Sequence, residues 1–354
     1  MIKRPCAMTL NAKEDHVLVG DKFGDVYALP LVAAAVPQSA STAKVAKPAS
    51  APFKPAATNL TVHTAKNLKS LESQKRQAEL LGSADAKEKE DMDFDHELLL
   101  GHVSMLTDIA VTSIPAEKST REYIITTDRD EHIRLSRGRP QAHIIENYCF
   151  GHTQFVSKTC LIRPDTLVSG GGESELFIWK LPDSQLRAKI DLRPGLESYW
   201  KLHGGSAPVP QSMAVSGIWA VPCRQHDLTA LFCALEGIAA LFRIDFAIDS
   251  VGESPLIPRA LAFAGNVLDL VSWPWSSDTD EEQWLVSIDT VHKPNSMDLS
   301  MATDVSRLQL GAEVKAFDLV DNDQGELVDA ADLKKLQDSL YTIERLRKRG
   351  NEED

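Results

Sequence analysis

The dipeptide Gly-His occurs at Gly101-His102 and again, 50 residues later, at Gly151-His152. Each copy precedes a strand-like run, a turn, a second run that ends in small residues, an acidic turn and a third run. The second copy ends in LVSGGGESELFIWKL (167–181). Such a repeat constrains the fold strongly, because each unit predicts a small antiparallel sheet that stacks against its neighbours.

Repeats that open with Gly-His and have Trp near the end of the third strand are typical of WD repeats, which form the four-stranded blades of a β-propeller. In such a unit the His bonds a Ser or Thr of the second strand and an acidic turn residue, and Trp covers this buried network. The predicted network residues are His152, Ser169, Glu173 and Trp179 in the second unit and His102, Thr126 and Asp130 in the first. We expect both histidines to be structural, because no second metal ligand lies at a recognisable spacing.

Short β-branched or aromatic runs between Gly, Asp and Pro turns continue through most of the chain. They predict an all-β propeller over residues 1–31 and 96–320, with about five blades. Closed propellers of this type usually have about seven blades, and closure of the ring removes the exposed sheet edges. Residues 1–12 resemble the middle of a blade, so we expect that further N-terminal blades are missing; a ring closed by these residues alone would contradict this.

Two segments differ from the strand pattern. Residues 32–95 are rich in Ala, Pro, Ser and Lys with poor hydrophobic periodicity, which predicts a disordered insertion. Residues 329–350 predict an amphipathic helix, with Asp329 as N-cap and an apolar stripe that packs on the propeller or on a partner. The basic run RLRKRG (345–350) fits phosphate binding, nuclear targeting or a solvated helix end equally well.

The composition excludes several classes of function. The net charge of −13 argues against a protein that binds nucleic acid unaided, since phosphates need a basic face. Five widely spaced cysteines form no C-x-x-C pair, so neither disulfides nor zinc is expected, which fits cytosol or nucleus. The most apolar stretch, 228–246, is interrupted by charged residues, and no membrane association is expected. The sequence has no glycine-rich cofactor loop, P-loop or nucleophile elbow, so a propeller enzyme is disfavoured.

The first unit is more specific than a general WD repeat. It contains RDEHIRLS (129–136), followed by GHTQFVS (151–157), and VGDKFGDVYAL (19–29) lies upstream. Together with LVSGGGESELFIW (167–179), these runs resemble the WD-repeat non-catalytic subunit of the tRNA (guanine-N7)-methyltransferase, in its fungal form. The resemblance is close over residues 16–30 and 100–182 and only architectural beyond residue 200.

The resemblance implies one half of a two-subunit enzyme. The partner would be a Rossmann-fold methyltransferase that binds S-adenosylmethionine and methylates a guanine in the tRNA variable loop. The propeller would need no cofactor; it would stabilise the catalytic subunit and help to position tRNA, with most tRNA contact made through the complex. Its location would be the nucleus, with the cytoplasm as a further possibility. A general WD scaffold or substrate adaptor of another nuclear complex is the alternative, but it does not explain the RDEHIR run.

Local charge points to candidate partner contacts. The segment from Arg121 to Arg163 contains seven positive and five negative residues, although the protein as a whole is acidic. Because side chains alternate along a strand, Ile133 and Leu135 are expected on one face and Arg134 on the other. Arg134 is the best candidate for an ion pair with an acidic residue of the methyltransferase, as the resemblance also implies. Further candidates for partner or tRNA phosphate are Arg129, Arg137 and Lys158. The alternative is that these side chains only solvate blade edges.

Overall fold

The computed structural model describes residues 5–32, 72, 96–116, 119–130, 132–204, 208–222, 228–247, 249, 251, 256–272, 284–289, 292, 294–295, 308–311, 316–317, 334, 338 and 340–347. The chain divides into two compact units, Met1–Ile2 with Ala33–Asp95, and Lys3–Val32 with His96–Asp354. All described residues except Glu72 belong to the second unit. The insertion predicted over 32–95 therefore lies outside the described residues, apart from Val32 and Glu72.

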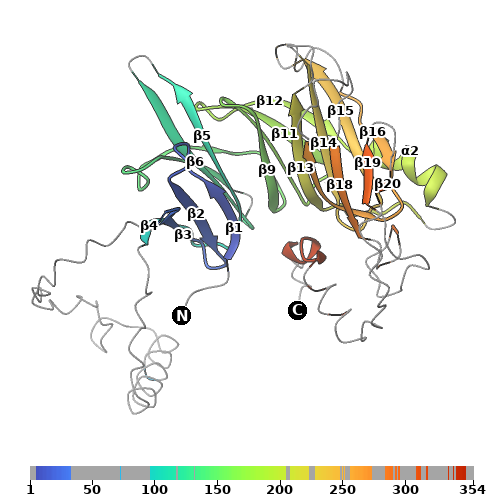
Figure 1. The fold of residues 1–354 in the computed structure, drawn as a ribbon, viewed down its shortest axis with the longest axis horizontal. Helices are drawn as coiled ribbons and strands as arrows, with labels where there is room; N and C mark the ends of the chain where they lie inside the picture. The colour runs from blue at the N-terminus through green and yellow to red at the C-terminus, as the bar shows by residue number, and fades with distance from the viewer. Residues whose placement is uncertain are drawn as a thin grey trace, which may run out of the picture. The chain divides into compact units, whose positions relative to one another are not determined.

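The described strands form five antiparallel sheets of four strands each, and every sheet uses consecutive strands (Figure 1). Sheet 1 contains β1 (Pro5–Leu10), β2 (His16–Asp21), β3 (Asp25–Pro30) and β4 (Glu97–Gly101). Sheet 2 contains β5 (Leu106–Pro115), β6 (Thr120–Asp128), β7 (Ile133–Arg137) and β8 (Ile145–Cys149). Sheet 3 contains β9 (Val156–Arg163), β10 (Thr166–Gly171), β11 (Glu175–Lys180) and β12 (Gln185–Asp191).

Two further sheets follow. Sheet 4 contains β13 (Val215–Pro222), β14 (Leu228–Leu235), β15 (Ala240–Ala247) and β16 (Arg259–Ala262). Sheet 5 contains β17 (Asn266–Ser272), β18 (Trp284–Asp289), β19 (Leu308–Gly311) and β20 (Ala316–Phe317). The predicted all-β class, with about five blades, is confirmed. The expectation that residues 1–12 form the middle of a blade is wrong, because β1 is an edge strand with no buried residue.

Neighbouring sheets contact each other through their first strands. β1 contacts β5, β5 contacts β9, β9 contacts β13, and β13 contacts β17. Because the strands are antiparallel, the start of the first strand, the turn between the second and third strands, and the end of the fourth strand lie at the same end of each sheet. We name the surface formed by these ends of the five sheets the upper face, although it points downward in Figure 1.

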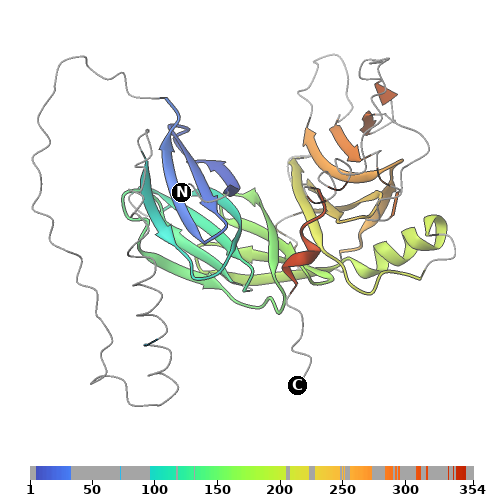
Figure 2. The ribbon, with the colours of Figure 1, turned by 90° about the horizontal axis from the view of Figure 1, so that it is seen from below.

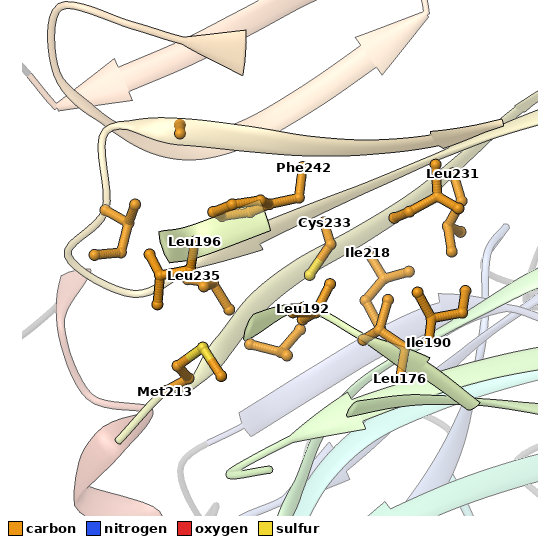
Figure 3. Packing of buried hydrophobic residues seen from close by; sticks show 14 of the residues in the cluster. Leu176, Ile190, Leu192, Leu196, Met213, Ile218, Leu231, Cys233, Leu235 and Phe242 are labelled. Atoms are coloured by element: carbon orange, nitrogen blue, oxygen red, sulfur yellow. The ribbon is translucent and has the colours of Figure 1, made fainter. Parts of the chain in front are cut away.

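The hydrophobic core lies between neighbouring sheets. Four clusters of buried residues fill the spaces between sheets 1 and 2, 2 and 3, 3 and 4, and 4 and 5. In the largest cluster, Leu176 and Ile190 of sheet 3 meet Ile218 and Cys233 of sheet 4 (Figure 3). Each sheet is thus held by the sheets beside it, which fixes the loops of the upper face in place.

The helix α2 (Arg193–His203) connects β12 to β13 and was not predicted (Figure 2). Pro194 stands in its first turn, where the missing N–H costs nothing. Leu196, Tyr199 and Trp200 recur at three- and four-residue spacing and are buried in the cluster between sheets 3 and 4. The short length of the helix hides this pattern in the sequence.

The helix predicted over 329–350 is wrong at its end. Lys334, Asp338 and Leu340 are helical, but residues 341–343 are not. Glu344–Leu346 form the short 3-10 turn η2, and Arg347 leaves it at φ −57° and ψ 128°. The reason is tertiary: the side chain of Glu236 accepts the backbone N–H groups of Ile343 and Glu344, at 2.8 and 2.7 Å. The rest of the predicted helix lies outside the described residues.

Candidate functional site

The structure brings together all four predicted network residues of sheet 3. His152 lies in the loop before β9, with Nε2 at 2.8 Å from Ser169 Oγ and Nδ1 at 2.9 Å from Glu173 Oε2. Trp179 Nε1 donates to the same Ser169 Oγ at 2.8 Å. A neutral His152 satisfies every group, since the serine hydroxyl can donate to Nε2 while it accepts from the indole.

The electrostatics of Glu173 follow from this network. Burial opposes its ionisation, but hydrogen bonds from His152 and from Thr153 prevail and lower the pKa of Glu173 to about 2. Thr153 contributes both its backbone N–H and its hydroxyl, the latter at 2.6 Å. The carboxylate therefore stays ionised and fastens the loop before β9 to the turn after β10.

Sheet 2 has a related but looser network. His102 Nε2 lies 2.8 Å from Thr126 Oγ1, as predicted. The carboxylate found at its other ring nitrogen is that of Asp128, at 3.4 Å, whereas Asp130 was predicted. Asp128 also accepts the backbone N–H groups of Asp130 and His132, so it shapes the turn before β7. Ser136, at the position where Trp is usual, is fully buried and its hydroxyl has no partner among the described residues.

These polar clusters are closed structural networks. His152 is hydrogen-bonded at both ring nitrogens, and His102 is hydrogen-bonded at Nε2 with the Asp128 carboxylate 3.4 Å from Nδ1, so neither ring has a nitrogen free for a substrate or metal. Among the described residues, no three His, Cys, Asp or Glu side chains gather closely enough to hold a metal ion. Within the same residues, no helix has the length and apolarity needed to cross a membrane.

Arg134 is in β7 and faces away from Ile133 and Leu135, which pack between sheets 2 and 3, so the predicted strand alternation is confirmed. The residue is only 8% exposed, because its side chain reaches from sheet 2 to sheet 1, where Nη1 donates to Gly101 O at 3.0 Å. Its buried Nε has no hydrogen-bond partner among the described residues. Burial lowers the pKa of Arg134, but a guanidinium remains charged at neutral pH.

The other three predicted contact residues lie elsewhere. Arg129 and Lys158 line a cavity of about 980 Å³ at the upper face, and Arg129 Nε donates to Leu346 O at 2.8 Å. Arg137 is at the opposite end of β7 from the upper face and pairs with Glu146 at 2.6 Å, which raises the pKa of the arginine. The structure thus separates Arg137 from the three residues nearer the upper face.

Two features near these residues were missed. Tyr148 and Phe150, at the end of sheet 2, stack at 5.5 Å, and His132 meets the Phe150 ring edge-on at 6.3 Å. Phe150 is 68% exposed, and its place directly before Gly151-His152 was the only sequence signal. Asp108 of β5 accepts the backbone N–H and hydroxyl of Thr159 in β9, at 2.8 and 3.0 Å, which ties two first strands together. Burial raises the pKa of Asp108.

The sheets and the His–Ser/Thr–acid networks define the class of the protein: it is a WD40 β-propeller protein. A family model described as the tRNA methyltransferase TRM82 WD40 domain matches residues 1–310. The chain belongs to this TRM82 family.

Individual relatives agree with this assignment. A protein of Phaeosphaeria nodorum named tRNA (guanine-N(7)-)-methyltransferase non-catalytic subunit TRM82 is 40% identical, with 100% of this chain and 75% of the relative covered. A Coccidioides immitis protein of the same name is 39% identical over 99% of this chain and 71% of its own length. Among solved structures, U3-55K is 10% identical with a TM-score of 0.46, covering 88% of this chain and 62% of that one.

Proposed function

We propose that this chain is the non-catalytic subunit of a tRNA (guanine-N7)-methyltransferase. It stabilises a catalytic subunit and helps to position tRNA for N7-methylation of a guanine in the variable loop. The catalytic subunit is a Rossmann-fold protein that binds S-adenosylmethionine, and tRNA is held mainly through the complex. The family assignment and the relatives' names support the proposal. The single observation that places the interface on the propeller is the buried, incompletely bonded guanidinium of Arg134.

Arg134 has the properties of an ion-pair residue that awaits its acceptor. One of its nitrogens is bonded to Gly101 O, while Nε is buried without a partner in the part of the chain that the structure describes. A buried donor without a partner costs about 1–3 kcal/mol, and more when charged. A carboxylate of the catalytic subunit that meets the exposed part of the guanidinium would compensate the buried charge.

The surroundings of Arg134 suit a protein partner. On the neighbouring strand, Tyr148 pairs with Arg134, and its ring stacks on the exposed Phe150. Val103, two residues after Gly101, is fully exposed. Aromatic residues and arginine dominate the energetics of protein interfaces, particularly where an exposed rim surrounds a desolvated centre. We therefore define the candidate interface as Val103, His132, Arg134, Tyr148 and Phe150.

The charge of the molecule supports an indirect role toward tRNA. A net charge of −13 repels a polyanion at long range, so most phosphate contacts belong to the partner. Lys158 and Lys22, which both line the upper cavity, are the basic side chains best placed to add a contact of their own. We also propose a nuclear location, supported by the basic run at 345–350; fluorescence microscopy of a tagged chain, with and without this run, tests it.

The test is co-purification with the cognate catalytic subunit after co-expression. Reversing the charge at Arg134 (Arg134→Glu) is expected to weaken binding by several kcal/mol, because it places a second carboxylate against the partner's carboxylate. Arg121→Glu is the matched control: Arg121 is in the same sheet but pairs with Glu146 at an exposed site. Wild type and Arg121→Glu should retain the catalytic subunit, and Arg134→Glu should lose it.

Since Arg134 is buried, a surface variant separates interface from stability. Phe150→Ala removes an exposed ring and should weaken binding without lowering the melting temperature. If folded wild type retains no methyltransferase, the proposed function is wrong. If it does, but both Arg134→Glu and Phe150→Ala bind like wild type, the interface lies elsewhere on the propeller.

A further inference from the structure

Residues 340–347, here named the strap, cross the upper face from sheet 5 to sheet 2, with η2 drawn in red in Figures 1 and 2. Tyr341 anchors one end. It is 6% exposed, its hydroxyl accepts Asn266 Nδ2 at 2.9 Å and donates to Asp289, and its ring meets His292 edge-on at 5.4 Å. The phenol is thus bonded on both sides within sheet 5.

The middle of the strap is held through its backbone. Glu236, in the turn between β14 and β15, accepts Ile343 N–H with one carboxylate oxygen and Glu344 N–H with the other. Arg129 of sheet 2 donates to the carbonyl of Leu346. Such contacts fix the position and direction of a peptide without selecting its side chains.

Arg347 anchors the other end between sheets 3 and 4. Its two terminal nitrogens donate to Gly172 O at 3.0 Å and to Met213 O at 2.9 Å, and its guanidinium lies over the Phe155 ring at 5.6 Å. A methyl group added at Gly172 would stand 2.6 Å from the Phe155 ring, so a side chain there would displace the ring. Carbonyl acceptors with an aromatic face match the fork and the flat cation of arginine better than the point charge of lysine.

From this arrangement we propose that the upper face is a binding site for linear peptides, which selects an aromatic hydroxyl and, six residues later, an arginine. Residues 341–347 occupy the site in cis. The groups that bind the peptide belong to sheets 2 to 5, and the hydrophobic clusters between these sheets fix their positions. This inference does not rest on the proposed methyltransferase partnership, because no residue of the candidate interface is among those that hold the strap.

The consequence is competition. A tethered segment meets its site at an effective concentration in the millimolar range, so only a tightly binding or locally concentrated peptide displaces it. Strap residues Tyr341, Ile343 and Leu346 line the upper cavity, together with Lys22 and Lys158. Displacement of the strap would therefore also open this cavity to solvent.

The test uses the full chain and a fluorescein-labelled peptide with the sequence of residues 338–350. In the double variant Tyr341→Phe and Arg347→Ala the strap is weakened, so the peptide should bind with a Kd at least tenfold lower than for wild type. Arg345→Ala is the matched control, because Arg345 is exposed and pairs with Asp338 alone among the described residues. Binding of the labelled peptide, followed by fluorescence anisotropy, should be unchanged in this control.

Specificity and folding need separate readouts. A peptide with alanine at both anchor positions should bind the double variant at least tenfold more weakly; equal binding would indicate general charge attraction and overturn the proposal. A folded double variant that binds no better than wild type would also overturn it. Should that variant unfold, wild type decides: with only the chain labelled with 15N, millimolar native peptide should speed hydrogen exchange of the chain's Ile343 and Glu344 amides, the alanine peptide should not, and an unchanged rate with both contradicts the proposal.

Discussion

At the residue scale, the predictions that succeeded rest on side chains whose chemistry allows few alternatives. His152, Ser169, Glu173 and Trp179 meet because their donors and acceptors complement one another in a buried network. Asp130 was predicted where Asp128 is found, since two acidic residues compete within one short turn. The buried state of Arg134 could not be predicted, because its cover comes from sheet 1, outside its own repeat.

The first stability prediction concerns Glu173→Gln. Losing the ionised acceptor of His152 and Thr153 should lower the free energy of unfolding at pH 7 by about 1.5–3 kcal/mol. Because the folded-state pKa is lowered from 4.5 to about 2, this contribution is complete above pH 4.5 and is lost as the pH falls through 2. The difference between wild type and variant in urea unfolding should therefore be large at pH 7 and much smaller at pH 3 and below.

A nearby carboxylate provides the control for this pH dependence. Glu175 pairs with Lys189 at the exposed surface of sheet 3, so Glu175→Gln should change stability by less than about 1 kcal/mol at either pH. A Glu173→Gln effect of equal size at pH 7 and pH 3 would show that the carboxylate acts through packing, not through its charge.

At the element scale, first, second and third strands were largely predictable and fourth strands were not. The inner strands carry buried β-branched and aromatic runs, as in β6 and β11. β8 and β12 are edge strands with one buried residue each, so they lack the alternation that marks a half-buried strand. The end of the C-terminal helix was wrong because Glu236, 107 residues away, takes the backbone donors of Ile343 and Glu344.

The helix α2 supplies a prediction at the same scale. Leu196 is fully buried between sheets 3 and 4, whereas Leu202 in the same helix is 82% exposed. Leu196→Ala should destabilise the protein by about 2–5 kcal/mol, through lost transfer energy and a residual cavity. Leu202→Ala should change the free energy of unfolding by less than about 0.5 kcal/mol. Chemical denaturation measures both, and similar values for the two would contradict the assigned burial.

At the scale of the whole molecule, a series of sheets held by four cores presents its loops on one rigid face. The number of sheets could be predicted from the repeat, since each unit needs a neighbour to bury its hydrophobic surface. How loops of different sheets meet depends on contacts between residues more than 100 positions apart, such as Arg129 with Leu346. The strap could therefore not be predicted from the sequence, and of the candidate interface only Arg134 was.

We propose that this propeller acts on tRNA only through a catalytic partner. The most direct test measures transfer of labelled methyl groups from S-adenosylmethionine to tRNA by the cognate catalytic subunit, with and without this chain. The chain alone should transfer none, the pair should exceed the catalytic subunit alone at least tenfold, and Arg134→Glu should abolish the gain. An equal rate with and without folded chain, or transfer by the chain alone, would contradict the claim.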